Sequence, residues 1–181
     1  MMKTIRTLIL ALLACFSLVA QAALSPAQVA ALKTTCLADT VTCKPLHDAA
    51  DDVGLAAYFN TDTVTYIVWR PSVTDREIMA SAEFDWTRVD NLTNGKARIW
   101  EYLLRFGTID PSKANVRAGI DATWVGTQAD LNVRAAVYVV FKRSATRAEK
   151  ALATGSGTTN SPSVMSFAGS ISYAEASLIR S

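Results

Sequence analysis

Helix-start signals recur along this chain, and they constrain its fold more than any other feature. A Ser, Thr or Asp stands before a helical pattern, with Pro at the first helical position or Gln, Glu or Asp three residues later. Four segments carry the signal: Ser25-Pro26-Ala27-Gln28, Thr74-Asp75-Arg76-Glu77, Asp110-Pro111, and Thr127 with Asp130. They predict a mainly α fold.

Apolar residues at helical spacing give these helices their approximate extent. The expected helices are 26–36, 45–59, 74–82, 96–106, 111–125 and 127–153, with a last turn from Tyr173. Residues 135–141 are apolar on every side, which predicts that the longest helix is central and buried. Thr63–Arg70 is β-branched and aromatic and Ser163–Phe167 is a shorter candidate, so we expect a minor two-stranded β element.

The expected organisation is a single compact helical domain, residues 23–181, preceded by a hydrophobic segment, residues 1–22. Within the domain, residues 23–60 form a predicted helical hairpin and residues 61–181 the main body. No internal repeat or domain linker interrupts the chain.

Residues 1–22 have the three parts of a cleavable export signal in order. A basic start is followed by the apolar run Thr7–Val19 and by Ala20-Gln21-Ala22, which predicts cleavage after Ala22. Two alternatives stay open: lipidation at Cys15, and a retained N-terminal helix that anchors or packs. Cleavage would leave Cys36 and Cys43 as the two cysteines, either as a disulfide of an oxidising compartment or as small buried thiols.

The charge of the chain is balanced overall but unevenly distributed. Cleavage lowers the 18 basic residues to 16, equal to the 16 acidic ones, so charge gives no argument for nucleic-acid binding. Residues 48–90 carry nine acids and three bases, whereas residues 96–150 carry ten bases and five acids. Neutralisation of the two halves within one molecule is the favoured interpretation, and head-to-tail packing of identical copies is the alternative.

The sequence shows no arrangement of residues that indicates a reaction or a cofactor. His47 is the single histidine, and a metal site with Asp51 is weaker than a solvated acidic helix face. Asp85 and Asp90 are paired carboxylates without a sign of burial, and residues 155–157 lack the frame of a nucleophile elbow. Arg143, Arg147 and Lys150 would share a helix face without interleaved aromatics. We therefore expect no enzyme activity, no catalytic or cofactor-binding residue, no metal and no small-molecule substrate.

Tryptophan and arginine are the notable residues of the middle of the chain. Both are enriched among the energetic anchors of protein interfaces, although core packing is the alternative for the tryptophans. The candidate interface residues are Trp69, Arg70, Trp86, Arg98, Trp100, Arg117 and Trp124.

From Leu24 onward the chain resembles a family of small proteins of tailed phages and prophages of proteobacteria. The opening LSPAQVAALK is similar to the start of that family. The other matching stretches are Val68–Ile78, Asp85–Glu101, Ile109–Thr127, Val133–Tyr138 and Ala145–Thr158. The signal-like extension and the two cysteines depart from the family pattern.

The resemblance implies a virion structural or assembly protein that acts at a head, neck or tail through other virion proteins or copies of itself. Its location would be the virion, assembled in the host cytoplasm. The alternative is an exported periplasmic or surface-associated binding domain with a Cys36–Cys43 disulfide. Any membrane contact would involve only residues 1–22, if they are uncleaved.

Overall fold

Helices dominate the computed structural model, which describes residues 23–181; the predicted signal segment lies outside the described residues. In chain order the elements are α2 (Pro26–Ala38), α3 (Cys43–Asp48), α4 (Asp52–Asn60), β1 (Asp62–Trp69), β2 (Val73–Thr74), α5 (Asp75–Met79), the 3₁₀ turn η1 (Trp86–Arg88), α6 (Asn94–Leu104), β3 (Thr108–Ile109), α7 (Ala114–Thr123), α8 (Gln128–Val140), β4 (Lys142–Thr146), α9 (Arg147–Ala151), β5 (Ala153–Thr154), β6 (Val164–Met165) and α10 (Tyr173–Arg180). The strands pair as β1–β4, β2–β3 and β5–β6. The predicted mainly α class is confirmed.

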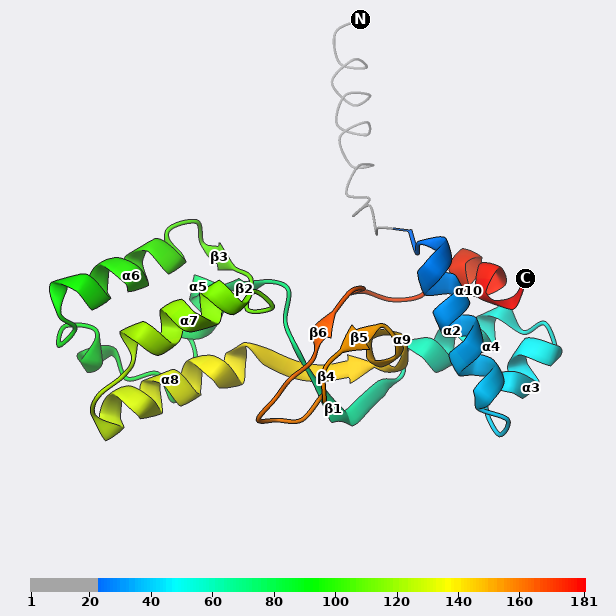
Figure 1. Ribbon diagram of the computed structural model, residues 1–181, viewed down its shortest axis with the longest axis horizontal. Helices are drawn as coiled ribbons and strands as arrows, with labels where there is room; N and C mark the ends of the chain where they lie inside the picture. Colours follow the sequence, from blue (N-terminus) through cyan, green and yellow to red (C-terminus); the bar gives the residue numbers. More distant parts are fainter. Residues whose placement is uncertain (1–22) are drawn as a thin grey trace, which may run out of the picture.

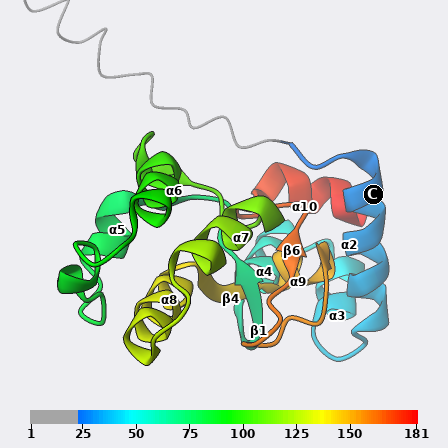
Figure 2. The same ribbon diagram turned by 60° about the vertical axis from the view of Figure 1, so that its left-hand side comes forward.

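Two separate clusters of buried side chains make up the core, and they divide the described chain into two lobes (Figures 1 and 2). The terminal lobe comprises residues 23–61 and 147–181 and contains α2, α3, α4, α9 and α10. The central lobe comprises residues 70–141 and contains α5, η1, α6, α7 and α8. The central lobe is therefore an insertion between the two halves of the terminal lobe.

The antiparallel β1–β4 ribbon joins the two lobes. Its register pairs Asp62 with Thr146 at the terminal lobe and Trp69 with Lys142 at the central lobe. The loop after β5 runs beside β1, where the Ile67 N–H donates to the Gly157 carbonyl at 2.7 Å. The predicted strand over residues 63–70 thus exists, and it connects the two halves of the core.

The terminal lobe is built from both ends of the described chain. Helices α2 and α10 pack together, and Arg180 of α10 donates to Asp52 of α4 at 2.7 Å. Capping boxes begin α2 at Ser25 and α10 at Ser172. The predicted hairpin over residues 23–60 is consequently completed by the last 35 residues of the chain, 147–181.

The helix predicted over residues 45–59 is wrong, because the chain breaks it into α3 and α4. Ala50 has a φ of 55°, in the left-handed region that ends a helix. Asp51 then caps α4 by accepting from the Gly54 N–H at 2.8 Å. Asp51 was expected on a solvated helix face, and it is instead the N-cap residue of α4.

The long helix predicted over residues 127–153 is also wrong. Helix α8 ends at Val140, and the chain continues as β4 and then α9. Thr146 and Glu149 form a capping box, so α9 begins afresh after the strand. The β-branched and aromatic residues 137–140 end α8 despite their strand propensity, and β4 is formed by the residues that follow them, Lys142–Thr146.

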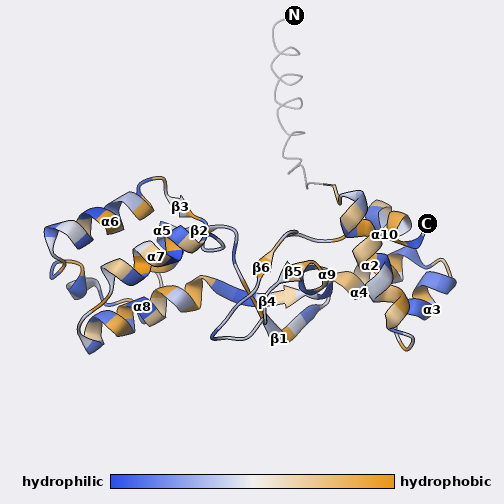
Figure 3. Cartoon of the chain, viewed as in Figure 1, coloured by the Kyte–Doolittle hydropathy of each residue, from blue (hydrophilic) through white to orange (hydrophobic). Residues whose placement is uncertain are grey.

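Other predicted boundaries shift by a few residues. Helix α7 begins at Ala114 rather than Pro111, because Asp110 accepts from the Ser112 N–H at 2.9 Å and closes a turn instead of capping the helix. Hydrophilic and hydrophobic residues alternate around α8, which packs one face on the central core (Figure 3).

Candidate functional site

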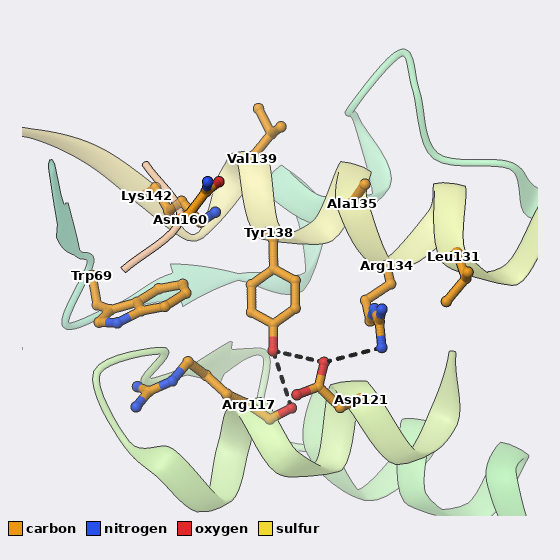
Figure 4. Close-up of a pocket in the computed structure, with 10 residues that line it drawn as sticks. All are labelled: Trp69, Arg117, Asp121, Leu131, Arg134, Ala135, Tyr138, Val139, Lys142 and Asn160. Atoms are coloured by element: carbon orange, nitrogen blue, oxygen red, sulfur yellow. Dashed lines mark hydrogen bonds and ion pairs between the residues drawn. The ribbon is translucent and has the colours of Figure 1, made fainter. Parts of the chain in front are cut away.

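A cleft of about 640 Å³ lies where the central lobe meets the β1–β4 ribbon (Figure 4). It is lined by aromatic, basic and aliphatic side chains from α7, α8, β1, β4 and the 155–163 loop. The lining residues are Trp69, Arg117, Asp121, Leu131, Arg134, Ala135, Tyr138, Val139, Lys142 and Asn160. We call this the basic cleft.

Trp69, the last residue of β1, forms one wall of the basic cleft. Its indole also belongs to the core of the central lobe, so packing fixes its position. The Arg117 guanidinium lies 4.7 Å from the indole centroid, a cation–π distance. The same guanidinium donates to the carbonyls of Pro111 at 2.6 Å and Ser112 at 2.8 Å. Arg117 is therefore a preorganised cation.

Tyr138 of α8 and Asp121 of α7 connect the two helices that line the cleft. The Tyr138 hydroxyl donates to Asp121 Oδ1 at 3.0 Å and to the Arg117 carbonyl at 3.3 Å. Burial raises the pKa of Tyr138, and the neighbouring Asp121 carboxylate raises it further, so the phenol stays protonated. Arg134, one turn before Tyr138, approaches Asp121 Oδ1 at 3.6 Å.

Lys142 begins β4 and places a third cation at the cleft. Its Nζ lies 5.5 Å from the ring centroids of both Trp69 and Tyr138, and it donates to the Thr159 carbonyl at 3.0 Å. Burial lowers the pKa of Lys142. A bound anion would oppose this effect, because it stabilises the charged ammonium.

The charges of the cleft favour an anionic ligand with an apolar part. Arg117, Arg134 and Lys142 supply three cations, whereas Asp121 supplies one carboxylate. Trp69, Tyr138 and the exposed aliphatic side chain of Val139 supply apolar surface. Guanidinium and ammonium groups beside aromatic rings bind carboxylates or phosphates.

A second exposed surface lies on α6 and on the turn that follows it. Ile99, Tyr102 and Phe106 follow one another at helical spacing, and Tyr102 and Phe106 are 60% and 84% exposed. Arg98 and Arg105 flank Tyr102 on the same helix and its C-cap. We call these five residues the α6 face. Exposed aromatic and arginine side chains of this kind are typical of protein interfaces.

The structure separates the seven candidate interface residues. Trp69 and Arg117 meet in the basic cleft, Arg98 lies on the α6 face, and Trp86 is 51% exposed. Arg70 is half-buried and has partners within the molecule: it donates to the Val140 carbonyl at 3.1 Å and to Glu77 at 2.5 Å.

Trp100 and Trp124 are corrections to the predicted interface. Both indoles are buried in the central core, where their ring centroids lie 5.2 Å apart. Both also pack against Phe84, so these two side chains belong to the core and are not exposed to a partner.

Sequence reasoning missed Asp121 of α7 and the cleft residues contributed by α8. Arg134 and Tyr138 are four residues apart, and that spacing places two side chains on one helix face. This spacing is visible in the sequence, but the apolar run 135–141 beside it favours a helix that is buried on every side.

The residues considered for a metal site and for a basic helix face do not come together in the structure. His47 accompanies Asp48 at 3.3 Å, whereas Asp51 caps α4. Arg143 lies on β4 and pairs with Glu149, so its predicted helix face with Arg147 and Lys150 is wrong. Within residues 23–181, no group of three His, Cys, Asp or Glu side chains is placed to hold a metal ion.

Cys36 and Cys43 are joined by a disulfide, with their Cα atoms 5.0 Å apart. Both residues are fully buried in the core of the terminal lobe. The bond ties the last turn of α2 to the start of α3. The sequence offered either a disulfide or two buried thiols, and in the structure the two cysteines are bonded to each other and also buried.

No family model, curated protein or solved structure matches this chain. Across the part of the chain that the structure describes, no helix is long and apolar enough to cross a membrane.

Proposed function

We propose that this protein is a structural or assembly component of a tailed-phage virion that acts through protein–protein contacts. The α6 face is the observation that carries the proposal. Phe106 and Tyr102 expose large aromatic surfaces beside two arginines, a composition that favours burial against another protein. The resemblance of the chain from Leu24 onward to small phage proteins supports the virion as the place of that contact.

Mass spectrometry of purified virions tests the proposal, using the phage or prophage that encodes this sequence. We expect the protein in the virion, and its absence from purified particles would overturn the proposal. The double substitution Tyr102→Ser with Phe106→Ser should leave the fold intact and reduce incorporation at least tenfold. Val64→Ser is the matched control, because Val64 is equally exposed but lies on the ribbon.

An exported binding domain is the second candidate function, and the disulfide favours it. Disulfides persist mainly in oxidising compartments such as the periplasm. This candidate requires cleavage after Ala22 and a bonded Cys36–Cys43 pair. Intact-mass measurement of protein made with its native N-terminus tests both requirements, and retained residues 1–22 or two free thiols would count against export.

A further inference from the structure

An acidic, aromatic surface segment lies at the end of the central lobe that is distant from the ribbon. Glu83, Asp85, Trp86 and Asp90 are all exposed and lie between α5 and α6, in and around η1. We call these four residues the acidic knob. Glu83, Asp85 and Asp90 form no ion pair with any residue in the described range 23–181. Their charge is available to another molecule.

The acidic knob is rigid enough to act as a contact. Asp85 Oδ1 accepts from the Thr87 N–H at 3.0 Å and from its hydroxyl at 2.7 Å. The exposed Trp86 packs edge-on against Phe84, with the ring centroids 5.1 Å apart. Arg88 then ties the segment to Asp130 at 2.7 Å. An indole held in place loses less conformational entropy on binding.

The knob is anchored beside the end of its own molecule's basic cleft that Leu131 and Arg134 line, yet it forms no ion pair with that cleft in the described structure. Arg88 fixes it to Asp130 in the first turn of α8, whereas Tyr138 and Lys142 of the cleft lie at the other end of that helix. The ten residue-to-residue steps from Asp130 to Val140 rise about 15 Å along an α-helix. Figure 1 shows the segment between α5 and α6 at the left end of the molecule and the ribbon near its centre.

The two surfaces are complementary in both charge and apolar character. The knob offers three carboxylates around one indole, and the cleft offers three cations and one carboxylate, Asp121, beside two aromatic rings. The cleft volume of about 640 Å³ lies within the range of about 300–1,000 Å³ that is usual for ligand pockets, so it has room for an indole.

We propose that the acidic knob of one copy of this protein docks into the basic cleft of the next copy. The knob carboxylates pair with Arg134, Lys142 and the outward edge of Arg117, and Trp86 packs on the apolar part of the cleft. The contact is heterologous, because two different surfaces meet, so it generates a ring or an open row of subunits. The inference rests on the proposed function in virion assembly and names one of the partners.

Mixing two complementary variants tests the docking. The cleft variant carries Arg134→Gln and Lys142→Gln, and the knob variant carries Glu83→Gln, Trp86→Ala and Asp90→Gln. Analytical ultracentrifugation of residues 23–181 should show concentration-dependent association of the wild type that weakens with salt. Each variant alone should associate at least tenfold more weakly. Their mixture should form a one-to-one heterodimer, because one intact knob meets one intact cleft.

The matched control carries Lys33→Gln and Arg76→Gln, which removes the same charge as the cleft variant outside both surfaces, and it should associate like the wild type. Circular dichroism checks each fold, and Trp86→Ala or Arg134→Gln alone replaces a variant that unfolds. A wild-type monomer at millimolar concentration, or a mixture that stays monomeric, would overturn the inference. Detection of the protein in virions is independent of this result, so docking and virion membership can fail separately.

Discussion

Arg143 and Glu149 form a two-point ion pair, 2.7 and 2.6 Å long, at the junction of the ribbon and the terminal lobe. Glu149 is only 1% exposed and also accepts from the backbone N–H groups of Thr146 and Gly169. Burial alone would raise the pKa of Glu149, but these hydrogen bonds and the charge of Arg143 outweigh it and lower the pKa.

Arg143→Met should therefore destabilise the protein by about 3–5 kcal/mol, because it leaves a buried carboxylate without its partner. Urea denaturation followed by circular dichroism measures the loss. Arg76→Met is the matched control, since Arg76 is exposed and forms no ion pair within the described chain, and it should change stability by less than about 0.5 kcal/mol. Equal effects of the two substitutions would contradict a structural role for the pair.

Acid should weaken the protein as two stabilising carboxylates become protonated. Hydrogen bonds from Arg88 and Thr127 lower the pKa of Asp130 to about 2, and hydrogen bonds from Thr74 and Arg70 lower that of Glu77 to about 2. A depressed native pKa adds stability above the unfolded value, near 4, which is lost as the pH falls toward 2. Urea midpoints from pH 7 to pH 2 should decline mainly below pH 4, and Asp130→Asn should flatten the decline.

Loss of the disulfide should destabilise the terminal lobe. Opening the loop between Cys36 and Cys43 removes about 2 kcal/mol in the chain-entropy description. Thermal unfolding with and without a reductant measures the effect, and the Cys36→Ala, Cys43→Ala variant should no longer respond to the reductant. Hydrogen exchange should rise in α2 and α3 and remain unchanged in α6 and α7, and a uniform rise would contradict the division into two core clusters.

Trp124 and Trp86 should differ sharply when replaced by alanine. Trp124 is 0% exposed among Phe84 and Trp100, so Trp124→Ala should cost about 3–5 kcal/mol of folding free energy. Trp86→Ala should cost about 1 kcal/mol or less, because half of that side chain already faces solvent. Chemical denaturation of both variants checks the difference, and similar costs would contradict the assignment of Trp86 to the surface.

Two glycines give opposite predictions for the same substitution. Gly157 has a φ of 66°, and a Cβ there would lie 2.3 Å from the Tyr66 ring, so Gly157→Ala should destabilise the protein by at least about 1 kcal/mol. Gly95 lies in the first turn of α6 with open space around it, so Gly95→Ala should stabilise by about 0.5–1 kcal/mol. Thermal unfolding of the two variants checks the signs.

Local signals predicted the helix starts better than the helix lengths. The capping boxes at Ser25, Thr74 and Thr127 are present, because their hydrogen bonds involve residues only three positions apart. The same pattern at Thr146 and Glu149 was overlooked, since apolar and basic residues around it also suit a continuous helix. Residues 142–146 form a strand because they pair with β1, and the paired residues are 73 to 84 positions apart in the sequence.

The candidate site was predictable only in part. Trp69 and Arg117 were singled out by residue type, but their contact depends on how α7 packs beside the end of β1. Trp86 is exposed because it lies on a 3₁₀ turn at the surface, whereas Trp124 is buried because it follows α7 into the core. Residue type alone cannot separate these cases, because tryptophan suits both environments.

The insertion of the central lobe has a consequence for the order in which the chain can fold during synthesis. Residues 70–141 are contiguous, so their core can assemble while the ribosome is still making the rest of the chain. Helices α2 and α4 are made before the central lobe, yet their packing partners Ala176 and Ile179 are made after it. The terminal lobe is thus the one that finishes folding last, because its first helices cannot complete their core until α10 has been made.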